Sequence, residues 1–298
     1  PAALAMAVEK AKETDAELVM ASDPDADRVG AAVKNNEGEW VLLNGNQTAL
    51  MFVYYLITRW KELGKINGKE YIVKTIVTTE TIKTIAERNG VEMYDVYTGF
   101  KWIANVMREN EGKKNYIGGG EESYGFLCED FVRDKDAVSA CVILAEIAAW
   151  AKDQGLSLYQ LLQKIYVEYG FSKEKGISVV KKGKSGAEEI EAMMKKFREN
   201  PLTEIAGSKV TYFYDYSTLK GKDYAENETV TLDMPTTSNV LQYFTEDNTK
   251  VSIRPSGTEP KIKFYCEVHS KVKNIDELPE AEKAAEEKIN QIKACLGK

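Results

Sequence analysis

Between residues 44 and 170, segments with the apolar spacing of helices alternate with short apolar runs typical of buried strands. The expected helices span residues 47–63, 80–88, 101–109, 137–152 and 158–169, and the expected strands span 70–78, 91–97 and 115–118. Alternation of this kind places helices across the connections between neighbouring strands. It therefore predicts an α/β domain built on a mixed or parallel sheet, and no other feature of the chain restricts its fold as strongly.

The segments on either side have different patterns. Upstream, an opening helix precedes short strands at 17–22, 29–33 and 40–43. Downstream, a lysine- and glycine-rich join at 173–186 leads to a polar helix at 187–200 and a last helix at 279–296. Between these helices, strands are expected at 209–216, 229–233, 240–244, 250–253 and 261–268. We therefore predict an α+β C-terminal domain after the α/β domain, with a hinge near Lys173.

Composition narrows the classes of function. The net charge of the 298 residues is -7 and no basic stripe appears, which argues against nucleic-acid binding. The most apolar run, residues 49–57, is far shorter than the roughly 20 residues of a membrane-spanning helix. Four cysteines without a Cys-x-x-Cys pair are typical of reduced thiols, so we expect a cytoplasmic protein without a membrane partner.

Three aspartates follow the expected strand 17–22 within five residues. Asp23, Asp25 and Asp27 alternate along the segment DPDADR, which ends at Arg28. If the loop curls, three carboxylates can face one centre, where a hard divalent cation would offset their repulsion. The alternative is a solvated turn capped by aspartates, but three acids directly after an apolar strand favour a metal site.

The segment GGGEESYG, residues 118–125, combines backbone freedom with polar side chains. Its glycines allow the backbone to approach a ligand, and Glu121 and Ser123 can accept from and donate to neighbouring sugar hydroxyls. A glycine-rich turn with solvated glutamates explains the same residues equally well when they are judged alone.

The segment RPSGTEP, residues 254–260, lies between two expected strands. A guanidinium from Arg254, hydroxyls from Ser256 and Thr258, and the open backbone at Gly257 make a set suited to a phosphate dianion. A hairpin turn with a surface arginine is the alternative. Together the three segments suggest a sugar phosphate as ligand.

In their order and spacing, these three motifs resemble those of the phosphoglucomutase and phosphomannomutase family. The resemblance covers essentially the whole chain and implies that residues 1–42 are the end of domain 2 of a four-domain enzyme. Residues 43–170 would be domain 3 and residues 171–298 domain 4. The family's catalytic serine lies in a Ser-His-Asn-Pro loop of domain 1, whereas the only histidine here is His269. Since the chain also opens on Pro1 inside an expected helix, we expect it to be part of a longer protein whose N-terminal domains are its partners.

The resemblance also implies roles for individual residues. Mg2+ would be held by Asp23, Asp25 and Asp27 together with a phosphoserine oxygen. The sugar hydroxyls would be read by Glu121 and Ser123, and the phosphate that is not transferred would be gripped by Arg254, Ser256, Gly257 and Thr258. The catalytic residues would be Arg28 and Lys101, the latter in a Thr-Gly-Phe-Lys segment like that of glucomutases. A solvated lysine at a helix start is the alternative for Lys101.

The implied reaction interconverts glucose 1-phosphate and glucose 6-phosphate through an enzyme phosphoserine and a bound sugar bisphosphate. Mannomutase-like and glucosamine-type members usually carry a Gly-His pair where this chain has Tyr124-Gly125, and a histidine where it has Phe100. The resemblance therefore favours glucose or pentose phosphates over mannose. Two rivals are a non-catalytic module that binds a sugar phosphate, and a metal-dependent phosphatase or glycosyltransferase.

Overall fold

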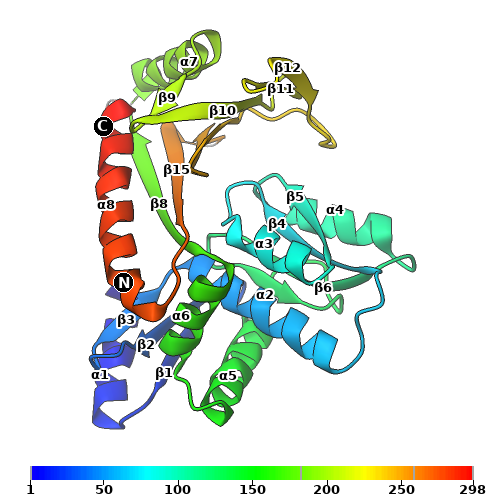
Figure 1. The fold of residues 1–298 in the computed structure, drawn as a ribbon, viewed down its shortest axis with the longest axis vertical. Coiled ribbons are helices and arrows are strands. Elements are labelled where there is room, and N and C mark those ends of the chain that lie inside the picture. The colour runs from blue at the N-terminus through cyan, green and yellow to red at the C-terminus, as the bar shows by residue number, and fades with distance from the viewer. Residues whose placement is uncertain (1, 182, 258, 297–298) are drawn as a thin grey trace. The chain divides into compact units, whose positions relative to one another are not determined.

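The computed structural model describes residues 2–181, 183–257 and 259–296, which form two compact units that divide between Gly170 and Phe171 (Figure 1). The first unit contains two sheets, and the second contains one antiparallel sheet with two helices. No helix in the described part of the chain is both long enough and apolar enough to span a membrane.

The first unit begins with a small antiparallel sheet. Its elements are a 3-10 turn at Ala2–Leu4, α1 Ala5–Glu13, β1 Leu18–Ser22, β2 Val29–Lys34 and β3 Trp40–Leu43. The strand order is β1-β2-β3, and Ser22 pairs with Val29 at the end of the first two strands. The acidic segment 23–28 is therefore the connection of an antiparallel pair, and not a loop at the carboxyl edge of a parallel sheet.

The larger sheet of this unit has the order β5-β4-β6-β7. Its strands are β4 Glu70–Thr75, β5 Glu92–Val96, β6 Asn115–Gly120 and β7 Phe126–Cys128. The helices of the unit are α2 Gly45–Glu62, α3 Thr81–Arg88, α4 Phe100–Asn110, α5 Ala137–Asp153 and α6 Leu158–Tyr169. Because β5, β4 and β6 are parallel and only β7 is antiparallel, the predicted α/β class is confirmed.

Helices cover both faces of the larger sheet. On one face, Phe100, Ile103 and Met107 of α4 pack with Tyr71 and other buried side chains of the strands. On the other face, Phe52 of α2 stacks on Phe126 of β7, with their ring centroids 4.6 Å apart. Burial of this kind contributes about 1.5–3 kcal/mol for each large apolar side chain. Helices α2 and α4 therefore stabilise the sheet whose strands β6 and β7 flank residues 121–125.

The second unit is built on the strand path β12-β11-β10-β13-β14-β15-β8, with β9 paired to β10. Its strands are β8 Phe171–Val180, β9 Glu204–Ile205, β10 Ser208–Asp215, β11 Lys220–Asp223, β12 Glu228–Thr231, β13 Leu241–Thr245, β14 Lys250–Pro255 and β15 Lys261–Ser270. Its helical elements are α7 Gly183–Glu199, a 3-10 turn at Ile275–Glu277 and α8 Leu278–Cys295. Phe197 of α7 meets Phe264 of β15 edge to face, and α8 packs on β15 and β8.

Several elements differ from the sequence predictions, among them the short strands β9 and β11, which were not predicted. The lysine-rich join is mostly strand, because β8 pairs with β15 along all ten of its residues from Phe171 to Val180. The strand predicted at 115–118 extends to Gly120, so the glycines 118–120 belong to β6 and are not part of a turn. The short strand β7 was missed, and it pairs with those glycines. A Cβ on Gly119 would lie 2.4 Å from the carbonyl oxygen of Val73, so glycine allows β6 to lie close to β4.

Candidate active site

Asp23 organises the acidic loop from within. Its Oδ1 accepts hydrogen bonds from the backbone N–H groups of Asp27 and Arg28, at 3.1 and 3.2 Å. Ala26 has a left-handed backbone with φ of 55°, which turns the chain between the two strands. Asp23 therefore supports the loop as a cap while Asp25 stays exposed at its tip.

The best-defined charge contact of the loop is between Asp27 and Lys135. Lys135 Nζ lies 2.7 Å from Asp27 Oδ2, and the lysine side chain is only 15% exposed. The hydrogen bond and charge of Lys135 hold the pKa of the Asp27 carboxyl below its usual range, against the opposing effect of burial. The Asp27 carboxylate is therefore stabilised in its charged form by a cation from elsewhere in the unit.

The other oxygen of this carboxylate fits a metal ligand. Asp27 Oδ1 is buried and has no hydrogen-bond partner, since Arg28 Nε lies 3.9 Å away. A buried carboxylate oxygen without a partner is costly, and Mg2+ prefers carboxylate oxygens. Across the described residues, however, no three acidic, histidine or cysteine side chains are gathered closely enough to hold a metal. The assignment of Asp23, Asp25 and Asp27 as metal ligands therefore stays a prediction.

The turn between β6 and β7 carries the predicted hydroxyl readers. Glu121 is buried and its Oε1 accepts the Gly99 N–H at 2.7 Å, which ties this turn to the start of α4. Ser123 is half-buried in the turn. The turn closes through the hydrogen bond from Glu121 N–H to the Gly125 carbonyl at 2.8 Å.

The acidic loop and the Glu121–Gly125 turn meet each other. The Val29 N–H, directly after the acidic loop, donates to the Tyr124 carbonyl at 3.1 Å. A Cβ on Gly125 would lie 2.6 Å from Cδ of Lys135, the same lysine that contacts Asp27. Two of the three predicted motifs are therefore adjacent within the first unit, and Lys135 lies against both.

Lys101 is exposed on the first turn of α4, with Nζ 5.1 Å from the centre of the Trp102 ring. It borders an open hollow of about 650 Å3 along one face of α4. Arg108 and Arg133 also line this hollow. The Arg28 side chain is exposed, with Nε 3.9 Å from Asp27 Oδ1. Its backbone N–H donates to Asp23 Oδ1 within the loop.

The third motif lies in the second unit. Arg254 is half-buried near the end of β14, and Ser256 and exposed Gly257 follow in the turn to β15. The Ser256 N–H donates to the Lys261 carbonyl at 2.7 Å, which removes this N–H from the expected anion donors. Thr258 lies outside the described residues.

Sequence reasoning missed Lys135. Its neighbours are Asp134 and Asp136, and a charged run of this kind is typical of a solvated surface. The sequence signal that could have identified Lys135 was its position directly before the apolar helix α5. Asp136 caps the N-terminus of this helix by accepting a hydrogen bond from the Ser139 N–H.

Comparisons with known proteins decide the family. Residues 44–169 match the model for the phosphoglucomutase/phosphomannomutase alpha/beta/alpha domain III, and residues 179–285 match that for the C-terminal domain of the same proteins. The chain belongs to the phosphoglucomutase and phosphomannomutase family. The resemblance stated from the three motifs is thereby confirmed.

Individual relatives agree with the family assignment. The chain is 38% identical over 272 residues to a phosphoglucomutase of Staphylococcus aureus strain USA300, covering 91% of this chain and 48% of that protein. It is 33% identical over 264 residues to the phosphoglucomutase of Staphylococcus haemolyticus, covering 89% of this chain and 47% of that one. The chain thus spans about half the length of the curated relatives it matches.

Solved structures of low sequence identity share the fold. A phosphoglucomutase/phosphomannomutase family protein from Burkholderia thailandensis superposes with a TM-score of 0.61 at 19% identity, covering all of this chain and 50% of that one. Parafusin of Paramecium, a phosphoglucomutase in an open form, gives a TM-score of 0.57 at 17% identity, covering 92% of this chain and 45% of that one.

Proposed function

We propose that this chain is the metal-, sugar- and phosphate-binding portion of a phosphohexomutase that interconverts glucose 1-phosphate and glucose 6-phosphate. The reaction passes through an enzyme phosphoserine and a sugar bisphosphate, and it takes place in the cytoplasm. The observation that carries the proposal is the meeting of the acidic loop with the Glu121–Gly125 turn around Lys135. A charge-neutralising loop next to a hydroxyl-binding turn is what phosphoryl transfer to a sugar requires.

Each motif has a role in this proposal. The buried Oδ1 of Asp27, with Asp23 and Asp25, would hold Mg2+, which offsets negative charge on a transferring phosphoryl group. The hydroxyls of the sugar bind to Glu121 and Ser123, and its distal phosphate binds to Arg254, Ser256, Gly257 and Thr258. Lys101 contacts the phosphate or moves a proton at the reacting oxygen, and Arg28 is the second catalytic residue of the proposal.

The nucleophile is proposed to lie outside these 298 residues, since no Ser-His-Asn-Pro segment occurs in the sequence. The purified chain should therefore bind glucose 1,6-bisphosphate but show no conversion of glucose 1-phosphate in a coupled dehydrogenase assay. Adding the N-terminal half of a full-length protein, with its serine loop phosphorylated, should restore turnover. Turnover by the chain alone, or failure to bind any hexose phosphate, would count against the proposal.

A non-catalytic module that binds a sugar phosphate is the second candidate, because the chain spans about half of its catalytic relatives. It predicts the same binding by the isolated chain. The two candidates differ in the reconstitution, since a binding module gains no turnover when the serine-bearing half is added.

A further inference from the structure

Glu122, next to the proposed hydroxyl reader Glu121, is held by two buried threonines, one at the end of β4 and one in the turn that follows. Its backbone N–H donates to Thr78 Oγ1 at 3.2 Å, and its Oε2 lies 3.2 Å from Thr75 Oγ1. The two threonine hydroxyls lie 2.8 Å apart, and both residues are fully buried. One glutamate thus contacts the threonine pair through both its backbone and its carboxylate.

The number of hydrogens available indicates which group donates in each of these hydrogen bonds. Each threonine hydroxyl has one hydrogen to donate, and a carboxylate can only accept. Thr78 Oγ1 is 3.4 Å from Glu122 Oε2 but 2.8 Å from Thr75 Oγ1, so we assign its hydrogen to the shorter contact with Thr75. Thr75 then donates to Glu122 Oε2. The result is a closed ring from the Glu122 N–H through Thr78 and Thr75 to the Glu122 carboxylate, here called the Thr75–Thr78–Glu122 ring.

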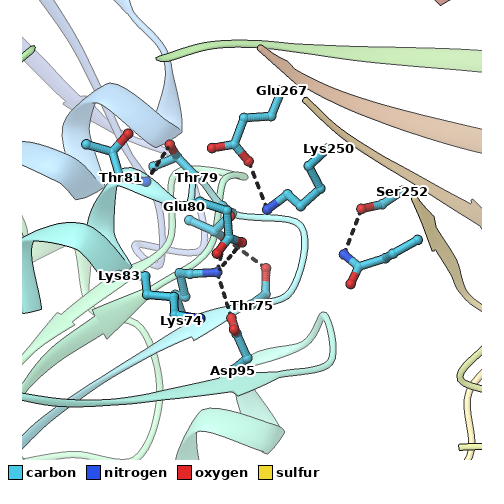
Figure 2. A network of polar contacts seen from close by, with 12 residues as sticks. Lys74, Thr75, Thr79, Glu80, Thr81, Lys83, Asp95, Lys250, Ser252 and Glu267 are labelled. Atoms are coloured by element: carbon cyan, nitrogen blue, oxygen red, sulfur yellow. Dashed lines mark hydrogen bonds and ion pairs between the residues drawn. The ribbon is translucent and has the colours of Figure 1, made fainter. Parts of the chain in front are cut away.

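The threonines themselves are held in place. The Thr78 N–H donates to the Thr75 carbonyl at 2.9 Å, which forms a tight turn after β4. The next residue, Thr79, donates its N–H to the side chain of Asn46 at the start of α2. In Figure 2, Lys74 on β4 lies between Glu80 and Asp95, with Nζ at 2.9 and 2.6 Å from their carboxylates. The two threonine hydroxyls therefore belong to a segment that is itself held by hydrogen bonds and ion pairs.

The backbone of the turn is also packed from the other side. A Cβ on Gly45 would lie 2.0 Å from the Glu122 carbonyl oxygen and 2.7 Å from the Tyr124 nitrogen. Backbone atoms cannot move aside as the end of a flexible side chain can, so the N-terminus of α2 lies in direct contact with the turn. Together, the ring and Gly45 restrict residues 122–124 from two directions.

We propose that Thr75 and Thr78 are positioning residues for sugar recognition. Through Glu122 they fix the orientation of the flanking side chains of Glu121 and Ser123, which read the sugar hydroxyls. This inference rests on the proposed function for its ligand. In this inference Glu122 positions the turn, whereas Glu121 contacts the sugar. The Glu-Glu-Ser motif alone does not separate these two roles.

The test uses the intact chain with Thr78→Val, which removes the hydroxyl at nearly constant volume, and Thr78→Ser, which keeps it. Thr84→Val, on half-buried Thr84 of α3, is the matched control. Binding of glucose 6-phosphate by calorimetry should weaken about tenfold in Thr78→Val, since an opened ring leaves a polar group poorly paired. Thr78→Ser should restore binding to near the original value, and Thr84→Val should leave it unchanged.

A second readout does not depend on any ligand. Hydrogen exchange of the Glu122 amide should accelerate about tenfold or more in Thr78→Val and in Thr75→Val, because this amide is a donor in the ring. It should stay slow in Thr78→Ser and Thr84→Val. Failure of the original chain to bind glucose 6-phosphate would count against the proposed function only.

The inference is overturned if the Glu122 amide keeps its protection in both valine variants. It is also overturned if Thr78→Val binds glucose 6-phosphate as well as the original chain, or if Thr78→Ser is as weak as Thr78→Val. Should Thr78→Val fail to fold, Thr75→Val gives the same two readouts.

Discussion

Lys135 Nζ lies 2.7 Å from Oδ2 of Asp27, so a lysine side chain places a positive charge at the acidic loop that we propose binds Mg2+. A lysine and a divalent cation both lower the energy of the charged carboxylate, and they repel each other. Lys135 and Mg2+ should therefore compete for the Asp27 carboxylate, and measurements of Mg2+ affinity can detect this competition.

Lys135→Gln should tighten Mg2+ binding by about tenfold, equivalent to ~1.4 kcal/mol, because it removes a competing positive charge. Isothermal calorimetry with MgCl2 on the purified chain measures this affinity. Lys152→Gln removes a lysine of the same charge from the exposed pair with Glu17 and should leave the affinity unchanged. Equal or weaker Mg2+ binding by Lys135→Gln would show that the lysine does not oppose the metal.

Asp25→Ala in a full-length enzyme containing this chain should lower kcat by about a hundredfold or more while changing KM little, because the metal acts mainly on transferring charge. Steady-state assays with glucose 1-phosphate measure both constants. Asp15→Ala is the control, since Asp15 is an exposed aspartate paired with Lys34 outside the acidic loop. Near-normal turnover of Asp25→Ala would remove this residue from the proposed metal site.

Gly45→Ala should destabilise the first unit by about 1–3 kcal/mol, because its methyl group would overlap the Glu122 backbone. Chemical denaturation followed by tyrosine and tryptophan fluorescence measures the free energy of unfolding. At Gly30, where a Cβ would lie 3.5 Å from the Leu4 side chain, alanine should be tolerated. Similar stabilities for the two alanine variants would contradict the close packing of α2 on the turn.

Lys250→Met should destabilise the second unit by about 3–5 kcal/mol, because it leaves the buried carboxylate of Glu267 without this cation. The Lys250 Nζ to Glu267 Oε2 distance is 2.8 Å, and the two side chains are 2% and 3% exposed. In the double variant Lys250→Met/Glu267→Leu, apolar groups replace both charges, so much of the stability should return. Urea unfolding of the single and double variants measures the difference, and an equal loss in both would argue against this pair as the cause.

His269 gives the second unit a pH dependence above the usual histidine pKa of 6.5. Burial by itself would lower the pKa of His269, but the Glu267 carboxylate, with Oε1 2.7 Å from Nε2, outweighs it and raises the pKa above its usual 6.5. Stability from this contact is therefore complete below pH 6.5 and is lost as the pH rises through the higher folded-state pKa. His269→Gln should remove this slope from urea-unfolding free energies measured between pH 6 and 9. An identical pH dependence in the variant would contradict this assignment.

The fold class and the local motifs were readable from the sequence because they depend on short-range patterns. Apolar periodicity predicted α6 at 158–169 with the bounds that the structure has, since Ser157 caps it through a local capping box. The strand predicted at 115–118 was ended two residues too early because glycine is common in turns, whereas here the glycines 118–120 let β6 lie against Val73 and Phe126. The strand at 171–180 was missed because its lysines and glycine disfavour a strand locally, and pairing with β15 overrides that preference.

The amino-acid sequence alone identified the chemical groups of this protein: three aspartates, a Glu-x-Ser pair and an arginine with hydroxyls, each within one short segment. Only the tertiary structure decided which distant side chains complete them, namely Lys135 at Asp27 and the threonine pair at Glu122. The physical reason is that a hydrogen bond or ion pair depends on distances of about 3 Å between atoms. Helix α5, packed on β1 and β7, and the start of α2, in contact with the Glu122 backbone, help to establish those distances, and no local sequence pattern encodes them.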